Sequence, residues 1–514
     1  MGLTSIAQLG FIKRQRELEK HITQAAQLQH DVMIHLIRRA ADTRYGRRKS
    51  FGTIRSYEDF SRLVPVNTYE ELKGDIDLMR HGEKDVLWPG KVKWYAKSSG
   101  TTNDKSKFIP VSKEGLQHIH YAGGSDVVAF YLKNNPRSRL FDGRALILGG
   151  SHSPNYNVAG SLVGDLSAIL IENINPLVNL IRVPDKQTAL ISDFEVKREQ
   201  IARLCLTKNV TNLSGVPSWM MSVLSRVMEL SGKQTLSEVW PSLEVFFHGG
   251  IAFTPYRKQY EQLVGNPDMN YMETYNASEG FFGIQSDPLD PAMLLMLDYD
   301  VFYEFAPMEA IDDNGLLTDA SKVVPIEGVE LGKNYAMIIS TSCGLWRYMI
   351  GDTVRFTSKN PYKFIITGRT KSFINAFGEE LIVDNAEQGL AYACDKTGAV
   401  VSEYTAAPVH RSDGVVPHHQ WVVEFSKEPD DLNRFADLLD QRLQQLNSDY
   451  EAKRFKDINM VRLDLVKARP GLFHDWLKMK GKLGGQHKVP RLSNSRQHIE
   501  EILSLAAKEV KNEE

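Results

Sequence analysis

Apolar side chains recur at roughly helical spacing along the N-terminal part of the chain, with arginine, lysine and glutamate between them. The apolar positions are Leu9, Ile12, Leu18, Ile22, Ala25, Val32, Leu36 and Ile37. This pattern predicts helical structure over residues 5–43. Such an amphipathic stripe favours packing against the body of the protein over binding to a membrane or to a partner helix.

Further along, short apolar runs alternate with helical patterns, and each run ends in small or turn-forming residues. The runs cover residues 144–148, 243–247, 334–339 and 362–366. Strands that end in this way are typical of α/β sheets, whose ligands bind beyond the carboxyl ends of the strands. We therefore predict an α/β fold with its ligand site at those strand ends.

The pattern restarts after Arg369, near a candidate hinge at residues 369–372. Strands are expected at 400–406, 420–425 and 458–466, and helices at 431–446 and 495–511. These segments predict a smaller α+β domain over residues 371–514, which follows a large N-terminal domain over residues 1–370.

Composition narrows the class of partner. The 514 residues carry a net charge of −2, so no basic field exists to attract nucleic acid or an anionic membrane. No signal-peptide core or membrane-spanning apolar run is visible. The cysteines, Cys205, Cys343 and Cys394, fit no disulfide or metal spacing. We expect a cytoplasmic monomer or weak homo-oligomer that binds small molecules. The histidines indicate no metal centre, and His418 and His419 are expected in a loop.

A hydroxyl-rich segment at residues 97–107 is the first candidate for chemistry. It contains Ser98, Ser99, Gly100, Thr101 and Thr102, and two lysines follow. Hydroxyls and exposed backbone N–H groups bind phosphate oxygens, glycine permits close approach, and lysines neutralise charge. The spacing is not that of a Walker A loop. The alternative is a flexible polar surface loop.

The second candidate is an aromatic–glutamate turn after an apolar strand. Thr274 and Tyr275 end the strand, and Tyr275 offers a flat face to adenine. Glu279 offers the carboxylate oxygens that Mg²⁺ prefers beside substrate phosphates. The alternative is that Ser278 caps a helix and Glu279 is solvated.

The third candidate is an Arg…Gly-Asp turn in which Asp352 accepts hydrogen bonds from ribose hydroxyls. Arg369 adds a cation at a later strand end. Gly249 and Gly250 supply an open backbone edge suited to the polar rim of adenine. The alternative reading of the turn is a structural ion pair between Arg347 and Asp352.

Together and in this order, the segments resemble the adenylate-forming superfamily of acyl-CoA synthetases, peptide-synthetase adenylation domains and luciferases. More closely, they resemble the auxin-responsive (Gretchen Hagen) acyl-acid amido synthetases. The matching stretches are residues 98–101, 275–279 and 347–352, and also 45–67 and 486–491. The resemblance implies a large multi-sheet N-terminal domain of the adenylate-forming type and a smaller, mobile α+β C-terminal domain.

The same resemblance implies roles for the motif residues. The loop at Ser98, Ser99 and Thr101 would contact the phosphates of ATP, and Ser99 would contribute to catalysis. The turn would provide an adenine-stacking ring and, at Glu279, a catalytic carboxylate that meets Mg²⁺ or phosphate. Asp352, with the cation at the later strand end, would hold ribose.

In the C-terminal part, Lys488 is the candidate for a mobile lysine that reaches the active site. Residues 378–381 with Glu387 resemble the segment after the superfamily hinge, and Lys371 stands where Asp is the commonest hinge residue. Walls of an acid pocket are expected near residues 121–130, 151–162 and 216–221.

The implied reaction has two steps. A carboxylic acid is adenylated by ATP with release of pyrophosphate, and the acyl group then passes to the amine of an amino acid with release of AMP. One alternative is an acyl-CoA synthetase, which would use the same adenylate with a thiol acceptor. Another is a nucleotide-binding regulator without turnover.

Overall fold

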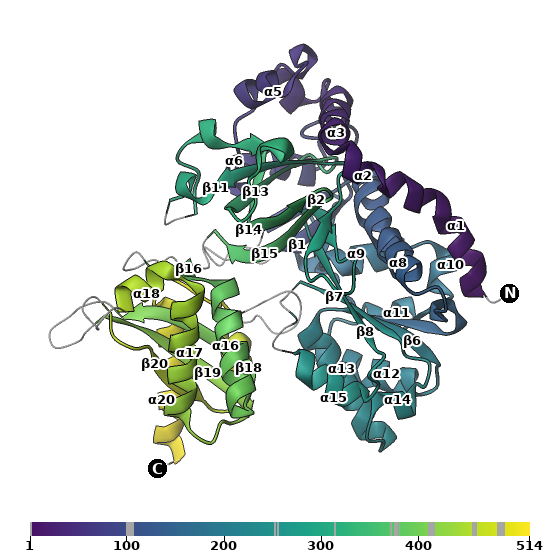
Figure 1. Ribbon diagram of the computed structural model, residues 1–514. Helices are drawn as coiled ribbons and strands as arrows, with labels where there is room; N and C mark the ends of the chain where they lie inside the picture. Colours follow the sequence, from purple (N-terminus) through teal and green to yellow (C-terminus); the bar gives the residue numbers. More distant parts are fainter. Residues whose placement is uncertain are drawn as a thin grey trace.

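The N-terminal helical segment lies along the outer surface of the main body in the computed structural model (Figure 1). The structure describes residues 3–98, 107–250, 253, 256–312, 315–370, 373–374, 379, 381–409, 417–454, 460–480 and 489–513. The predicted helical stretch consists of three consecutive helices, α1 (Leu3–Leu18), α2 (Lys20–Thr23) and α3 (Ala25–Ala40). The guanidinium of Arg14 bonds Asp126 and Asp298, which fixes α1 to the body.

A twelve-stranded mixed sheet forms the centre of the main body, in the order β12-β11-β13-β14-β15-β10-β9-β8-β7-β6-β3-β5. Its strands are β3 (Arg144–Ile147), β5 (Arg182–Val183), β6 (Val210–Gly215), β7 (Val245–Gly249), β8 (Asn270–Ala277), β9 (Gly280–Ile284), β10 (Met293–Leu295), β11 (Val301–Pro307), β12 (Val324–Pro325), β13 (Asn334–Thr341), β14 (Tyr348–Lys359) and β15 (Tyr362–Arg369). The neighbours from β5 to β8 are parallel, and the remaining pairs are antiparallel. All four apolar runs predicted as strands lie in this sheet.

Alternate residues of β7 enter different cores, because successive side chains of a strand point to opposite faces. Phe247 belongs to a core shared with α3 and α8 (Ala122–Asn134). Phe246 belongs to a second core covered by three helices. These helices are α12 (Phe194–Leu206), α13 (Pro217–Ser231) and α15 (Arg257–Val264). Helices therefore pack on both faces of the sheet, and because the neighbours from β5 to β8 are parallel, their carboxyl ends lie at one edge.

A second, three-stranded sheet has the order β2-β1-β4, with β1 at Trp94–Ser98, β2 at Lys107–Val111 and β4 at Leu162–Gly164. β1 and β2 are antiparallel, with Ser98 opposite Lys107. Its presence confirms the expectation of a large multi-sheet N-terminal domain. The connection between these two strands carries the predicted phosphate loop, and Ser99, Gly100, Thr101 and Thr102 lie outside the described residues.

The C-terminal part has its own sheet and core and stands beside the main body (Figure 1). Strands β18 (Val400–Val409), β19 (His418–Lys427) and β20 (Asp464–Ala468) pack with α16 (Val383–Thr397), α17 (Leu432–Leu446), α19 (Leu472–Met479) and α20 (Gln497–Glu513). The predicted α+β composition is confirmed. The boundary at 370 and 371 stays a prediction, since Lys371 lies outside the described residues, as does Lys488.

The expectation of a loop at His418 and His419 is wrong, because both residues belong to β19. His419 is completely buried, and its Nε2 lies 2.7 Å from Oε1 of Glu379, which is also buried. The pair fixes the start of the C-terminal part to its sheet. Among the described helices, none combines the length and apolarity needed to cross a bilayer.

Candidate functional site

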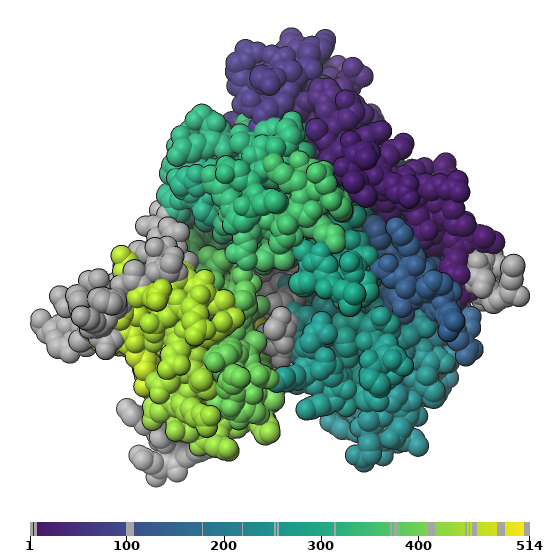
Figure 2. Space-filling view, in the orientation of Figure 1, coloured from purple at the N-terminus to yellow at the C-terminus, as the bar shows by residue number. Residues whose placement is uncertain are grey.

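A cavity of about 2900 Å³ lies between the strand ends of the main body and the C-terminal part. In Figure 2 the two parts flank this hollow near the centre of the molecule. Every described residue that the sequence predicted for the site lines the cavity. These residues are Ser98, Gly249, Gly250, Thr274, Tyr275, Ser278, Glu279, Asp352 and Arg369. Their roles stay predictions, but three motifs that are far apart in the chain meet in one cleft.

The aromatic–glutamate segment is a tight hairpin turn between β8 and β9 and begins no helix. Ser278 therefore caps no helix, and the alternative of a solvated Glu279 is wrong, since this residue is only 7% exposed. Burial raises the pKa of Glu279, and the nearby charge of Lys107 opposes that rise. Within the described part of the chain, the buried Ser278 hydroxyl has no hydrogen-bond partner. A buried carboxyl beside an unpaired hydroxyl suits a polar ligand.

Asp352 is held by two partners on the cleft wall. The hydroxyl of Tyr275 donates to its Oδ2 at 2.5 Å, and Nε of Arg369 lies 3.1 Å from its Oδ1. Asp352 on β14 and Arg369 on β15 stand directly opposite each other, so the pairing of these two strands sets the contact. The expectation of a turn at Asp352 is wrong, because it lies inside β14, where Gly351 has a φ of +87°.

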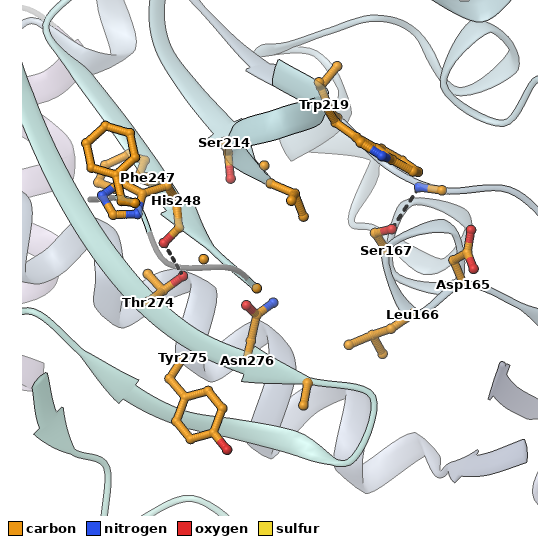
Figure 3. A pocket seen from close by; sticks show the side chains of 18 of the residues that line it. Asp165, Leu166, Ser167, Ser214, Trp219, Phe247, His248, Thr274, Tyr275 and Asn276 are labelled. Carbon is orange, nitrogen blue, oxygen red and sulfur yellow. Dashed lines mark hydrogen bonds between the residues drawn. The ribbon is translucent and has the colours of Figure 1, made fainter. Parts of the chain in front are cut away.

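Tyr275 is more enclosed than a free stacking platform. Its ring packs edge-on against Phe282 at 4.9 Å and is 5% exposed. Burial, followed by the adjacent Asp352 charge, raises its pKa well above the usual value. In Figure 3 the ring points away from Trp219, whereas the next side chain, Asn276, points toward the pocket. Sequence reasoning missed Asn276, although the two-residue period of a strand places it on the opposite face from Tyr275.

Arg347 does not pair with Asp352, so that alternative is wrong. Its guanidinium contacts both carboxylate oxygens of Glu304 at 2.7–3.1 Å. It also donates to the carbonyl oxygens of Ser61 and Val64, at 3.0 and 2.8 Å. Arg347 and Glu304 are 2% and 1% exposed. The pair stabilises the interior, which leaves Asp352 to face the cleft.

A double glycine stands at the end of β7, and the close approach of β8 requires the first of the two. A methyl group on Gly249 would lie 2.3 Å from the carbonyl oxygen of Thr274. The Thr274 hydroxyl donates to the carbonyl oxygen of His248 at 3.1 Å, as Figure 3 shows. Gly250 has a φ of +81°, which favours glycine. Both glycines border the cavity, and their predicted role at the rim of adenine stays a prediction.

The opposite wall contains polar residues that the sequence did not single out. The backbone N–H of Gly150 donates to the hydroxyl of Ser167 at 2.8 Å, and Figure 3 shows Ser167, Asp165 and Trp219 across from β8. Asp165 accepts a hydrogen bond from the backbone N–H of Ser151 at 2.9 Å. Of the predicted wall segments, 121–130 and 216–221 line the cavity. The segment 151–162 does not, because the wall passes from Gly150 to Asp165 there.

The chain matches three domain families in succession. They are described as the GH3 family N-terminal domain at residues 14–269, the GH3 family central domain at 294–369 and the GH3 family C-terminal domain at 384–497. A relative described as "Probable indole-3-acetic acid-amido synthetase GH3.1" of Arabidopsis thaliana is 23% identical, over 94% of this chain and 91% of its own length. "Indole-3-acetic acid-amido synthetase GH3.4" of the same plant is 21% identical, over 93% and 91%.

Solved structures share the fold. A structure titled "GH3.15 acyl acid amido synthetase" superposes with a TM-score of 0.76 over 95% of both chains, at 19% identity. A 2-hydroxyisobutyryl-CoA ligase in the postadenylation state superposes with a TM-score of 0.59 over 95% of this chain and 94% of that chain, at 13% identity. The predicted architecture, a large sheet-based body with a smaller C-terminal α/β part, is therefore confirmed.

Proposed function

The chain belongs to the GH3 family, and from that premise we propose that it joins a small carboxylic acid to the amine of an amino acid at the expense of ATP. The observation that carries this proposal is the meeting of β1, β8, β14 and β15 at one cavity. Their predicted phosphate, adenine and ribose residues face the same space from distant parts of the sequence. A nucleotide-binding regulator would not need this set together with a large adjoining pocket.

In the first step an oxygen of the substrate carboxylate attacks the α-phosphorus of ATP, and the bond to the pyrophosphate oxygen breaks. We assign binding of the phosphates to Ser98 and to the predicted loop residues 99–102. Asp352 accepts hydrogen bonds from the ribose hydroxyls, and Arg369 orients it from the neighbouring strand. Developing charge on the phosphoryl oxygens is stabilised by positioned donors and by the lysine that we assign as Lys488.

The carboxyl of Glu279 fits a divalent cation, since it is buried at the turn and faces the cavity. Magnesium bound there would neutralise phosphate charge during the adenylation. The protonation state of Glu279 also matters for this step, because its raised pKa makes the carboxyl easier to protonate than that of an exposed glutamate. Ligation requires the ionised form, so cation and proton compete for this group.

We propose that the acid substrate binds along the cavity wall across from β8. Apolar surface is supplied by Val216, Trp219 and Met221, which lie on or just before α13, and by Tyr121. This lining favours an acid with an apolar or aromatic body over a short, highly charged one. The relatives named as indole-3-acetic acid-amido synthetases are consistent with that class.

Product analysis tests the proposal. The protein is incubated with ATP, a panel of aromatic and aliphatic acids, and either the amino acids or coenzyme A, and products are identified by mass spectrometry. We expect AMP, pyrophosphate and an acyl-amide. A thioester formed instead of an amide would identify an acyl-CoA synthetase. Absence of AMP across the whole panel would identify a protein without this turnover.

A further inference from the structure

Two carboxyl groups outside the nucleotide motifs face the cleft from its two sides. Glu273 lies on β8, two residues before Tyr275, and Glu387 lies on α16 of the C-terminal part. No described residue forms a hydrogen bond or an ion pair with either carboxylate. Both side chains are half-buried, and they line the cavity that holds the predicted nucleotide residues.

A buried polar ring stands beside Glu273. His248 is 3% exposed, lines the same cavity, and is opposite Glu273 in the register of β7 and β8. Its Nδ1 has no hydrogen-bond partner among the residues that the structure describes. Burial lowers the pKa of His248 to about 3, with a smaller contribution from the Arg257 charge, so the ring is neutral at physiological pH. An unpaired buried nitrogen next to a carboxylate indicates a polar ligand at this place.

Burial, modified by nearby charges, brings the pKa of both carboxyls close to neutral. Burial raises the pKa of Glu273 to about 7, against the opposing charge of Arg257 on α15. Burial also raises the pKa of Glu387 to about 7; Arg491 opposes this rise, and Asp384 and Glu273 add to it. The two groups belong to different parts of the protein and line one cavity. Another titratable group in this region is Tyr404 on β18, whose pKa rises well above its usual value through burial and the Glu387 charge.

We propose that Glu273 and Glu387 form the acceptor site, where they bind the ammonium group of the amino acid and remove its protons. This inference rests on the proposed function, since it assigns the second substrate of that reaction. Along an extended strand, two residues span about 6.6 Å, which keeps Glu273 within one amino-acid length of the nucleotide residues on β8. Arg257 on α15 also lines the cavity, and its guanidinium suits the carboxylate of the acceptor.

The stoichiometry of the transfer requires two proton acceptors. An ammonium has no lone pair, so one carboxylate first takes a proton and leaves a neutral amine. The nitrogen lone pair then forms the C–N bond at the acyl carbon, and the C–O bond to AMP breaks with its electrons on the phosphate oxygen. The resulting nitrogen still carries an extra proton, which the second carboxylate takes to give the neutral amide. Acceptors with pKa values near the working pH are the most effective in such steps.

The two half-reactions separate this site from the nucleotide site. Glu273→Gln and Glu387→Gln are compared with Glu451→Gln, a matched change at an exposed glutamate outside the cavity. ATP–pyrophosphate exchange reports adenylation, and single-turnover transfer from preformed acyl-adenylate reports the acceptor step. We expect the cleft variants to keep wild-type exchange and to transfer to amino acids roughly a hundredfold more slowly. Glu451→Gln should leave both rates unchanged.

Hydroxylamine provides the decisive readout, because it is largely unprotonated at neutral pH and needs no base before it attacks. Only one proton then has to be removed, after the C–N bond forms, and each single variant keeps one carboxylate to take it, so both variants should transfer the acyl group to hydroxylamine at the wild-type rate. With an amino acid, wild-type transfer should rise with pH as the carboxylates ionise and level off above about pH 7. The variants should instead keep rising with the fraction of free amine.

Each contrary result has a distinct meaning. Equal slowing with hydroxylamine and amino acids would show a structural effect and overturn the inference. Wild-type transfer to amino acids in both variants would overturn it as well. Absence of pyrophosphate exchange in the wild-type protein with every acid tested would instead refute the proposed function.

Discussion

The ion pair between Arg347 and Glu304 offers a sharp test of the interior, because its members are 2% and 1% exposed. Replacing Arg347 by Met removes three contacts to the Glu304 carboxylate and two to backbone carbonyl oxygens. The hydroxyl of Tyr57, 2.9 Å from Oε1, is then the remaining hydrogen-bond donor among the described side chains. Breaking one half of such a buried pair costs about 3–5 kcal/mol. We expect the same range for Glu304→Gln and for Arg347→Met.

Urea unfolding followed by tryptophan fluorescence measures this loss. Trp346 is fully buried next to Arg347 in the chain, so it reports on the N-terminal body. The matched control is Arg62→Met, since Arg62 pairs with Asp59 on the surface and its side chain is 69% exposed. A surface pair contributes about 0–1 kcal/mol, so the control should unfold almost as the wild type does.

The double variant Glu304→Gln with Arg347→Met completes the cycle. Because it removes both charges, it should be less destabilised than the sum of the single variants, by about 2 kcal/mol or more for groups in direct contact. A wild-type unfolding midpoint for Arg347→Met, together with a raised KM for ATP, would contradict this reasoning. That combination would favour the pairing of Arg347 with Asp352 that the sequence alone left open.

Three further changes probe the cleft. Glu279→Gln should slow ATP–pyrophosphate exchange by about 10²–10³ with unchanged circular dichroism, while Glu451→Gln has no effect; unaltered exchange would remove Glu279 from the site. Gly249→Ala should lower stability and exchange because its methyl group would lie 2.3 Å from a β8 carbonyl oxygen, whereas Gly52→Ala, with open space around it, serves as a neutral control in urea unfolding. Tyr275→Phe removes a hydrogen bond to a carboxylate worth about 1.5–3 kcal/mol and should raise the KM for ATP by about tenfold or more; an unchanged KM would show that this hydroxyl does not position the ribose side.

Local patterns in the sequence were enough to predict the strands with long apolar runs, whereas short strands such as β4, β5 and β12 were not predicted. The run at 243–247 became β7, at Val245–Gly249, because alternate residues enter two cores and the terminal glycines allow the next strand to approach. The run at 458–466 was placed too early, since β20 covers Asp464–Ala468. Boundaries shift in this way because apolar content alone does not determine where sheet pairing begins.

Contacts between distant residues could not be predicted from the sequence. Arg347 has a carboxylate five residues ahead at Asp352, and local spacing favours that partner. The fold instead pairs it with Glu304 across β11 and the start of β14, where both groups are removed from water. Ser278 was ambiguous for a related reason, since a serine before an acidic residue suits a helix start and a hairpin turn equally well. The pairing of β8 with β9 decides for the hairpin.

The proposed nucleotide site and the proposed acceptor site lie next to each other along β8 and its turn, and each serves one step of the reaction. Tyr275 and the turn at Glu279 belong to the main body, and so does Glu273 on the same strand, so their spacing is fixed by one extended backbone. Glu387 belongs to α16 in the C-terminal part, so its distance from that strand depends on how the two parts are placed. On the proposals above, adenylation uses strand-borne residues together with Lys488, whereas transfer also needs a carboxylate that the C-terminal part delivers. Both steps therefore depend on the C-terminal part, adenylation through Lys488 and transfer through Glu387 on α16, whereas Glu273 serves transfer from the main body.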